Sequence, residues 1–161
     1  VVGDAHALSR YFDKPFDLVV SFAVFEHFAM PWIVAREIAR CLKVGGVAAI
    51  ETHFSFSSHE RPWHFFQCSD MALKALFSPA LGFECIEAGF SNPIVGRFSS
   101  LADAYLRNRP VTGLYCHSEL LARKVRHVED FSWDSVSLDA VVGELVYPAP
   151  RPAPEDDSPS P

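Results

Sequence analysis

The chain has 161 residues, of which 49% are hydrophobic and 21% charged, and its formal net charge is −6. These values fit one soluble globular domain with an adequate core and exclude a disordered or fibrous protein. The 14 Lys and Arg face 20 Asp and Glu and form no basic run, which argues against a surface that follows nucleic acid phosphates. No apolar run reaches about 18 residues and no leader is recognisable, so we expect a cytoplasmic protein without a membrane partner.

The cysteines are widely spaced along the chain and form no C-x-x-C pair; they are Cys41, Cys68, Cys85 and Cys116. Each lies in otherwise apolar surroundings. We therefore expect reduced core residues rather than a disulfide or zinc framework.

The first half of the chain predicts strands separated by a helix. Residues 1–5 predict the end of a short strand followed by a loop. Residues 17–22 form a continuous apolar run with β-branched valines, which predicts a strand covered on both faces in a parallel sheet. Residues 31–43 have apolar positions at helical spacing, with a proline at the start and two glycines as a stop, and residues 47–50 predict the next strand. Strand, helix and strand make one βαβ unit of an open parallel sheet.

The second half continues with alternating elements. Ser69 or Asp70 can cap a helix that runs to about Phe77, and residues 83–87 then predict a strand. Residues 99–108 predict a short helix, and residues 114–124 a further strand.

The end of the chain divides into two parts. Residues 126–148 contain spaced aromatic and aliphatic side chains, which predict an extension packed on the domain. Residues 149–161 are rich in proline and acidic residues and cannot bury apolar area, so we expect this tail to be disordered.

Polar residues stand at three predicted strand ends, where open α/β sheets bind their ligands. They lie in residues 3–6, 21–27 and 51–53. The Asp4 carboxylate can accept hydrogen bonds from an amine and hydroxyls of a ligand, or it can serve a turn or a helix cap. Ser21 and Phe22 can line a pocket.

The pair Glu26-His27 has several interpretations from the residues alone. It can act as acid and base, ligate a metal, or begin a helix as a local pair. Residues 52–69 add further candidate ligands among aromatic side chains: His53, His59, Glu60, His64 and Cys68. Their spacing reproduces no usual zinc pattern. A loop after a strand end that contains this many aromatic side chains is more typical of a substrate lid or wall.

The order of motifs resembles the class I S-adenosylmethionine-dependent methyltransferases of the type 11-like group. The stretches GDAHAL, FDLVVSFAVFEH, PWIVAREIARCLKVGG and VAAIETHFSF follow one another at the intervals of that family. The resemblance covers about residues 1–125, which implies a partial methyltransferase domain with a Rossmann-like sheet. The piece HERPWHFF is similar to a subgroup found among glycan or secondary-metabolite methyltransferases.

The resemblance implies S-adenosylmethionine as the cofactor and assigns residues to it. Asp4 holds the adenine amine, and Ala5 contacts the adenine ring through its backbone. The methionine part of the cofactor faces Ser21, Phe22 and Ala23.

The resemblance also implies the acceptor end of the site. His27 is the candidate base, His53 is the second, and the loop after His53 covers the substrate. Some quinone-modifying members carry an extra acid before the equivalent of Glu26-His27 and hold a divalent metal with it. Ala23 occupies that position here, so we assign no metal.

The sequence departs from the family at its start. Members begin with a strand and a G-x-G-x-G loop, then a second strand that ends in an acid, and nothing before Val1 supplies either. We therefore expect an N-terminally truncated sheet whose first two strands are absent. Either residues 1–5 pair beside residues 17–22, or the edge stays open and favours self-association, and we expect poor cofactor binding.

The function predicted is S-adenosylmethionine-dependent O- or N-methyl transfer to a small molecule or glycan-type acceptor, not to nucleic acid. One alternative is a non-catalytic methyltransferase-like fragment that serves as an interaction module. Another is a different α/β enzyme such as a nucleotide-binding reductase, for which the chain has no glycine fingerprint.

Overall fold

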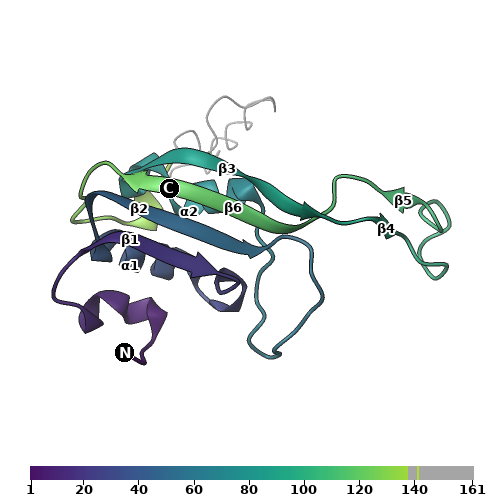
Figure 1. Ribbon diagram of the computed structural model, residues 1–161, viewed down its shortest axis with the longest axis horizontal. Coiled ribbons are helices and arrows are strands. Elements are labelled where there is room, and N and C mark those ends of the chain that lie inside the picture. Colours follow the sequence, from purple (N-terminus) through teal and green to yellow (C-terminus); the bar gives the residue numbers. More distant parts are fainter. Residues whose placement is uncertain (138–140, 142–161) are drawn as a thin grey trace, which may run out of the picture.

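The computed structural model describes residues 1–137 and residue 141. A four-stranded sheet has the order β1 (Phe16–Phe22), β2 (Leu42–His53), β6 (Tyr115–Lys124), β3 (Phe83–Pro93), as Figure 1 shows. β1 and β2 are parallel, whereas β6 is antiparallel to both of its neighbours. Helix α1 (Pro31–Cys41) connects β1 to β2. The predicted α/β fold and its βαβ unit are confirmed.

Helix α1 begins at the predicted Pro31 and ends at Cys41, before the predicted end at Lys43. Pro31 occupies the first turn, where the missing N–H is not needed. The apolar side chains of Val34 and Ile38 are buried against the sheet. At the other end the Lys124 ammonium, itself buried, donates to the carbonyls of Ala39 (2.6 Å) and Leu42 (2.7 Å). It thereby satisfies carbonyls that a helix C-terminus leaves without partners.

Strand β2 starts immediately after α1, earlier than the predicted residue 47. The parallel register pairs Phe16 with Leu42 and then Leu18 with Val47, so residues 43–46 bulge out of the ladder. Gly45 lies in the left-handed region with φ of 89°, a conformation that side chains disfavour, and this turns the bulge. The two glycines therefore shape the strand rather than preceding it.

Helix α2 (Asp70–Leu76) also follows its predicted signals. The Ser69 hydroxyl accepts from the amide of Ala72 at 3.1 Å and caps the first turn. A 3-10 turn, η3 (Pro79–Leu81), then leads to Gly82, where φ is 89° and an added Cβ would lie 2.5 Å from the carbonyl of Arg126. Only glycine fits there, and β3 follows directly.

The core lies between the sheet and the two helices. Its largest fully buried side chains include Phe25, Phe77, Phe83, Leu42, Ile50, Leu73 and Val34. The ring centroid of Phe77 is 5.9 Å from that of Phe25 and 5.3 Å from that of Phe83. Phe131 and Trp133 pack against this cluster. The predicted tail, residues 149–161, lies outside the described residues.

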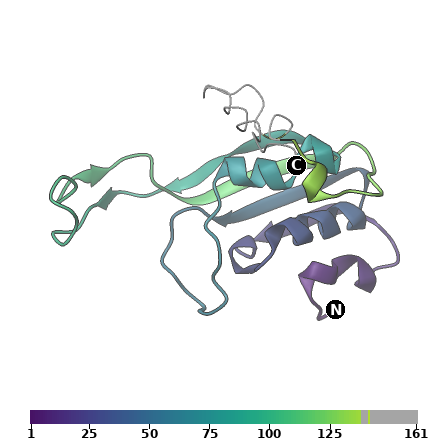
Figure 2. The same ribbon diagram turned by 180° about the vertical axis from the view of Figure 1, so that it is seen from behind.

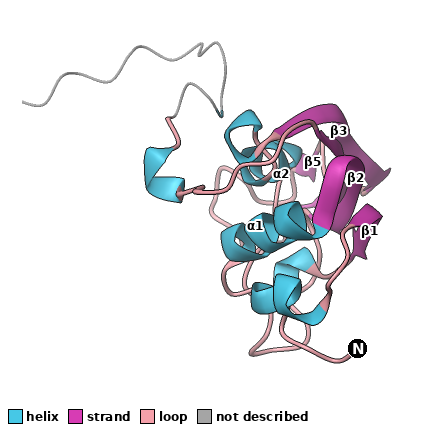
Figure 3. Ribbon diagram, turned by 90° about the vertical axis from the view of Figure 1, so that its left-hand side faces the viewer, coloured by secondary structure: helices cyan, strands magenta, loops and turns pink. Residues whose placement is uncertain are grey.

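The expectation that residues 17–22 are covered on both faces is wrong. Seen along the sheet, the helices lie on one side of the strands only (Figure 3), and the view from behind shows them covering that face (Figure 2). On the other face Leu18, Val20 and Phe22 are 54%, 48% and 61% exposed. In the described part of the chain no second layer of helices covers this face, and β1 is an edge strand.

The predicted strand at residues 1–5 is absent. Instead a 3-10 helix, η1 (Ala5–Tyr11), lies beside α1 (Figure 1). The Asp4 carboxylate accepts from the amide of His6 at 2.9 Å, and this cap favours the helical turn over an extended strand. Of the two arrangements expected for β1, the open edge is the one observed among residues 1–137.

The predicted helix at residues 99–108 is also wrong. This segment forms turns at the tip of an arm that projects from the sheet, in which β4 (Gly96–Arg97) pairs with β5 (Pro110–Val111) (Figure 1). Backbone hydrogen bonds between Phe98 and Arg109 (3.0 Å) and between Asn108 and Phe98 (3.1 Å) close the tip. These cross-arm bonds use backbone groups that a helix would need.

The remaining strands lie where the sequence predicts them, whereas two of the cysteines are not core residues. β3 includes the predicted residues 83–87, and β6 matches the predicted residues 114–124 to within one residue. All cysteines are free, but Cys85 is exposed and Cys116 only half-buried because both lie on strands with an uncovered face. Within the described residues, no helix combines the length and apolarity needed to cross a membrane.

Candidate functional site

A short turn after β1 positions the site. Ala23 adopts φ of 51° and donates its amide to the Glu51 carbonyl at 3.1 Å, so the parallel pairing extends one residue beyond the strand. The 3-10 turn η2 (Phe25–His27) follows. Phe25 is fully buried and packs edge-on against Phe28, with ring centroids 5.2 Å apart. Burial of Phe25 draws Glu26 into the protein at the carboxyl end of β1.

The Glu26 carboxylate is the centre of this region. It is fully buried, and its Oε2 accepts from the Thr52 hydroxyl at 2.6 Å. Its Oε1 lies 2.8 Å from Nδ1 of His53, but the two atoms are not aligned as a hydrogen bond. Both atoms therefore remain buried without a hydrogen-bond partner, which is costly for polar groups.

His27 is held in one tautomer by the loop that follows β2. Its Nδ1 lies 2.7 Å from the carbonyl oxygen of Trp63. A carbonyl can only accept, so Nδ1 carries the proton and Nε2 of the neutral ring has a free lone pair. Nε2 is 3.9 Å from Glu26 Oε1 and 3.6 Å from Glu60 Oε2. This lone pair can accept a proton or ligate a metal.

His53 lies next to Glu26 at the end of β2 and is buried. Burial lowers the pKa of His53, the nearby Glu26 carboxylate opposes that shift, and the neighbouring histidines His117, His59 and His64 reinforce it. The ring stacks on Phe56 with centroids 4.5 Å apart. His53 is therefore neutral at neutral pH.

This burial predicts a pH-dependent stability. Because the pKa of His53 is lower in the folded protein, the unfolded chain binds the proton first. The stabilising contribution is full above the unfolded pKa, about 6.5, and is lost as the pH falls through the folded pKa. Urea unfolding at about pH 7.5 and about pH 5 should show a smaller loss for His53→Gln than for the parent. An equal loss in both proteins would contradict the assignment.

Residues 54–69 form a loop that carries more histidines to the same place. The ring centroid of His59 is 5.1 Å from that of His27, 5.1 Å from that of His53 and 4.6 Å from that of His64. We call the five rings the histidine cluster: His27, His53, His59, His64 and His117. The amide of Phe65 donates to the Glu26 carbonyl at 2.8 Å, so the loop is attached to the site it borders.

The predicted cofactor residues lie in two separate places. Both side-chain hydrogen bonds of Asp4 come from His6 to the single oxygen Oδ1. Ala5 begins η1, and Nε2 of His6 accepts from the amide of Met30 at 3.3 Å, which attaches this segment to the chain beyond η2. Ser21, Phe22 and Ala23 stand at the end of β1. The structure thus joins His27 and His53 around Glu26, whereas the hydrogen bonds of Asp4 stay within residues 4–11.

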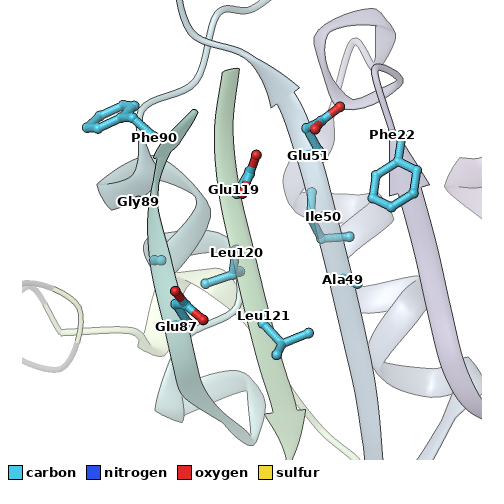
Figure 4. Close-up of a pocket in the computed structure, with 11 residues that line it drawn as sticks. Phe22, Ala49, Ile50, Glu51, Glu87, Gly89, Phe90, Glu119, Leu120 and Leu121 are labelled. Atoms are coloured by element: carbon cyan, nitrogen blue, oxygen red, sulfur yellow. The ribbon is translucent and has the colours of Figure 1, made fainter. Parts of the chain in front are cut away.

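The uncovered face of the sheet holds a shallow hollow of about 450 Å³. Phe22 points over one side of it, and the carboxylates of Glu51, Glu87 and Glu119 stand around it (Figure 4). The floor is apolar, with Ala49 and Leu121. This face is therefore acidic and partly apolar.

Three residues of the site have roles that were not assigned from the sequence. Thr52 fixes the Glu26 carboxylate, the Trp63 carbonyl orients His27, and His117 stacks on His53 with centroids 5.2 Å apart. A strand-end position next to His53 was the available signal for Thr52. His117 lies on β6, far along the chain, and only the antiparallel register brings it to His53.

Comparison with known families bears on this arrangement. Residues 1–50 match the model of the family described as the methyltransferase domain. This segment contains η1, β1, η2, α1 and most of β2. The match covers less than half of the chain and shows that this segment is similar to the family. No curated protein matches the sequence.

Solved structures are similar to this chain, and the two with a TM-score of at least 0.50 share its fold. A SAM-dependent methyltransferase from Archaeoglobus fulgidus has a TM-score of 0.55 at 16% identity, over 77% of this chain and 66% of that one. The YcgJ protein from Bacillus subtilis gives 0.50 at 18% identity, over 79% and 70%. TehB from Haemophilus influenzae gives 0.46 at 20% identity, over 77% and 40%.

The chain thus spans 40% of TehB and 66% of the Archaeoglobus protein. The recognition as a class I methyltransferase is confirmed by the family match and the shared fold. S-adenosylmethionine is the cofactor that accompanies this domain and this fold.

Proposed function

We propose that the methyltransferase domain transfers a methyl group from S-adenosylmethionine to an oxygen or nitrogen of a small-molecule acceptor, glycan-type hydroxyls included. The observation that carries this proposal is the lone pair of His27 Nε2, which a backbone carbonyl fixes in direction at the end of β1. S-adenosylmethionine supplies an activated methyl together with its leaving group. The protein therefore needs to position the reactants and remove a proton.

The residues at the end of β1 and in η1 fit one side of the cofactor. The two side-chain hydrogen bonds of Asp4 use Oδ1, and the side chain is exposed, which leaves Oδ2 for an adenine amine. The backbone of Ala5 can contact the ring. The end of the strand, with Ser21, Phe22 and Ala23, can face the methionine part.

The acceptor end of the site is assigned to the histidines. Nε2 of His27 takes the proton from the acceptor, and the resulting imidazolium is stabilised by the carboxylates of Glu26 and Glu60, at 3.9 Å and 3.6 Å. His53, neutral and buried, is the second candidate. Its Nδ1 faces Glu26 Oε1.

An NMR titration tests the cofactor assignment on this chain. We expect S-adenosylmethionine, added to millimolar concentrations in the presence of a chelator, to shift amide resonances in residues 4–5 and 21–23 with weak affinity. Resonances of the arm, residues 96–111, provide the internal control and should not move. Shifts confined to other regions, or no shifts at saturating cofactor, would contradict the proposal.

The open edge of β1 favours a second candidate, a methyltransferase-like interaction module that associates through this edge. Its backbone groups on that side have no neighbouring strand among the described residues, and three large apolar side chains of β1 itself are exposed: Leu18, Val20 and Phe22. Sedimentation velocity separates the candidates. A monomer at all micromolar concentrations would remove self-association from the proposal.

A further inference from the structure

Two histidines near Glu26, His27 and His59, share an arrangement that is typical of metal ligands. Nδ1 of His27 lies 2.7 Å from the Trp63 carbonyl, and Nδ1 of His59 lies 2.8 Å from the Ser57 carbonyl. Each Nδ1 therefore carries the proton and donates it to a backbone oxygen, which leaves both Nε2 lone pairs free. Metal-binding histidines almost always donate their other ring N–H to such an acceptor, because the bond fixes the tautomer and the ring orientation.

The third candidate ligand is the Glu26 carboxylate, one oxygen of which is buried without a hydrogen bond. Glu26 is fully buried, Thr52 satisfies its Oε2, and Oε1 has no hydrogen bond within the described structure. Ligand atoms of Glu26, His27 and His59 all lie within 4.8 Å of one another. A cation between them would neutralise the carboxylate and use both lone pairs.

The distances between the ligand atoms are close to those that one ion requires. Two atoms that each lie about 2.1 Å from a zinc ion are at most about 4.2 Å apart. Glu26 Oε1 and His27 Nε2 are 3.9 Å apart, so this pair needs almost no movement. His59 is on the loop of residues 54–69, and its amide donates to Nδ1 of His64 at 3.3 Å, which holds its backbone against the cluster.

We propose that Glu26, His27 and His59 bind one divalent transition metal ion of the zinc class, with a further coordination position open. Two imidazoles and one carboxylate suit zinc, whereas magnesium prefers oxygen ligands throughout. Three protein ligands with an open position form the usual arrangement of catalytic zinc. This ligand set differs from that of the quinone-modifying methyltransferases, in which an acid at the position of Ala23 holds the metal. Here the third ligand, His59, comes from the loop of residues 54–69.

A second group of metal-ligand type, His53, Cys116 and His117, is less suitable. The Asn92 amide nitrogen lies 2.8 Å from Nδ1 of His117, and since that amide can only donate, His117 carries its proton on Nε2. This N–H is directed at the Cys116 sulfur, 3.6 Å away. The ring therefore presents no lone pair to the group.

The consequence for the reaction rests on the proposed function, whereas metal binding itself does not. With the ion bound, Nε2 of His27 is occupied and no longer accepts a proton. The ion would instead lower the pKa of an acceptor hydroxyl at its open position, and this hydroxyl would lose its proton to solvent. The role of base given to His27 above applies to the metal-free domain.

Cobalt and zinc titrations test the site without cofactor or acceptor. We expect one Co²⁺ per chain with the visible d–d bands of a four- or five-coordinate site, displaced by Zn²⁺ and unaffected by Mg²⁺. His59→Gln and His27→Gln should each weaken Zn²⁺ binding by at least about 100-fold, as measured by competition with a chromogenic chelator. His117→Gln is the matched control and should leave the affinity unchanged.

Several results would overturn the proposal. They are the absence of tight Zn²⁺ binding, full affinity in His59→Gln, or a cobalt–thiolate charge-transfer band, which would place the ion at Cys116. Circular dichroism of each variant verifies its fold, and the half-buried position of His59 on a loop keeps that variant informative. Because the cofactor titration is run in chelator, failure of one experiment does not imply failure of the other.

Discussion

Phe77→Ala should lower the free energy of unfolding by about 3–5 kcal/mol. Phe77 is fully buried at the end of α2, and its ring contacts those of Phe25 and Phe83. These contacts join α2 to the turn after β1 and to β3. Removing the ring leaves a cavity between helix and sheet that the neighbouring aromatic side chains cannot fill. Since small domains are stable by only about 5–15 kcal/mol, this single change should bring the domain close to unfolding. Urea denaturation followed by circular dichroism measures it.

Phe22→Ala provides the matched control for Phe77→Ala. The same side chain is removed, but Phe22 lies on the uncovered face of the sheet and is 61% exposed. Its loss should change stability by less than about 1 kcal/mol. Similar losses for the two variants would mean that the core is not where the structure places it.

His27→Ala should reduce methyl transfer by about 10²–10⁴-fold when the reaction is assayed in chelator. The substitution removes the lone pair at Nε2 and leaves the Trp63 carbonyl without its donor, while the buried Glu26 stays bonded to Thr52. Formation of S-adenosylhomocysteine with a panel of small hydroxyl and amine acceptors measures turnover. Added imidazole should restore part of the rate in the variant, because it replaces the missing base.

His117→Ala is the control for this experiment. His117 belongs to the same cluster, but its ring nitrogens contact Asn92 and Cys116 rather than an open space. Turnover should therefore stay within about threefold of the parent. Full turnover in His27→Ala would remove His27 from the mechanism.

The sequence predicted the elements whose signals are local. The proline start of α1 and the serine cap of α2 each act within one turn, and both helices are found where these signals predict them. The apolar run of β1 was equally clear. Family resemblance then supplied the correct fold.

The errors arose where distant parts of the chain decide the structure. Whether β1 is covered on both faces depends on a second layer, which residues 1–137 do not provide. The segment of residues 99–108 has helix-forming residues, but cross-arm bonds from Phe98 override that preference. Local propensity is weaker than such tertiary contacts.

In the site, too, the residues could be predicted from local sequence, whereas their geometry depends on distant parts of the chain. Glu26 and His27 were visible as a pair, and His59 and His64 as part of a dense cluster, but their geometry depends on the loop folding back. The backbone carbonyl of Trp63 fixes the tautomer of His27. Because every residue has a backbone carbonyl, the sequence does not indicate which one makes this contact. The orientation of the ring could be learned only from the structure.

The attachment of the loop has a consequence for how ligands enter. Amides of Phe65 and Phe66 donate to the Glu26 carbonyl, and the amide of Cys68 donates to the His53 carbonyl. In hydrogen exchange these amides should be protected together with the ends of the strands, while the amides of Ser57, Ser58, Glu60 and Arg61 exchange quickly. Local fluctuations would then move the tip of the loop and leave its hydrogen-bonded base in place. An acceptor would enter beside His59 while Glu26, His27 and His53 keep their positions.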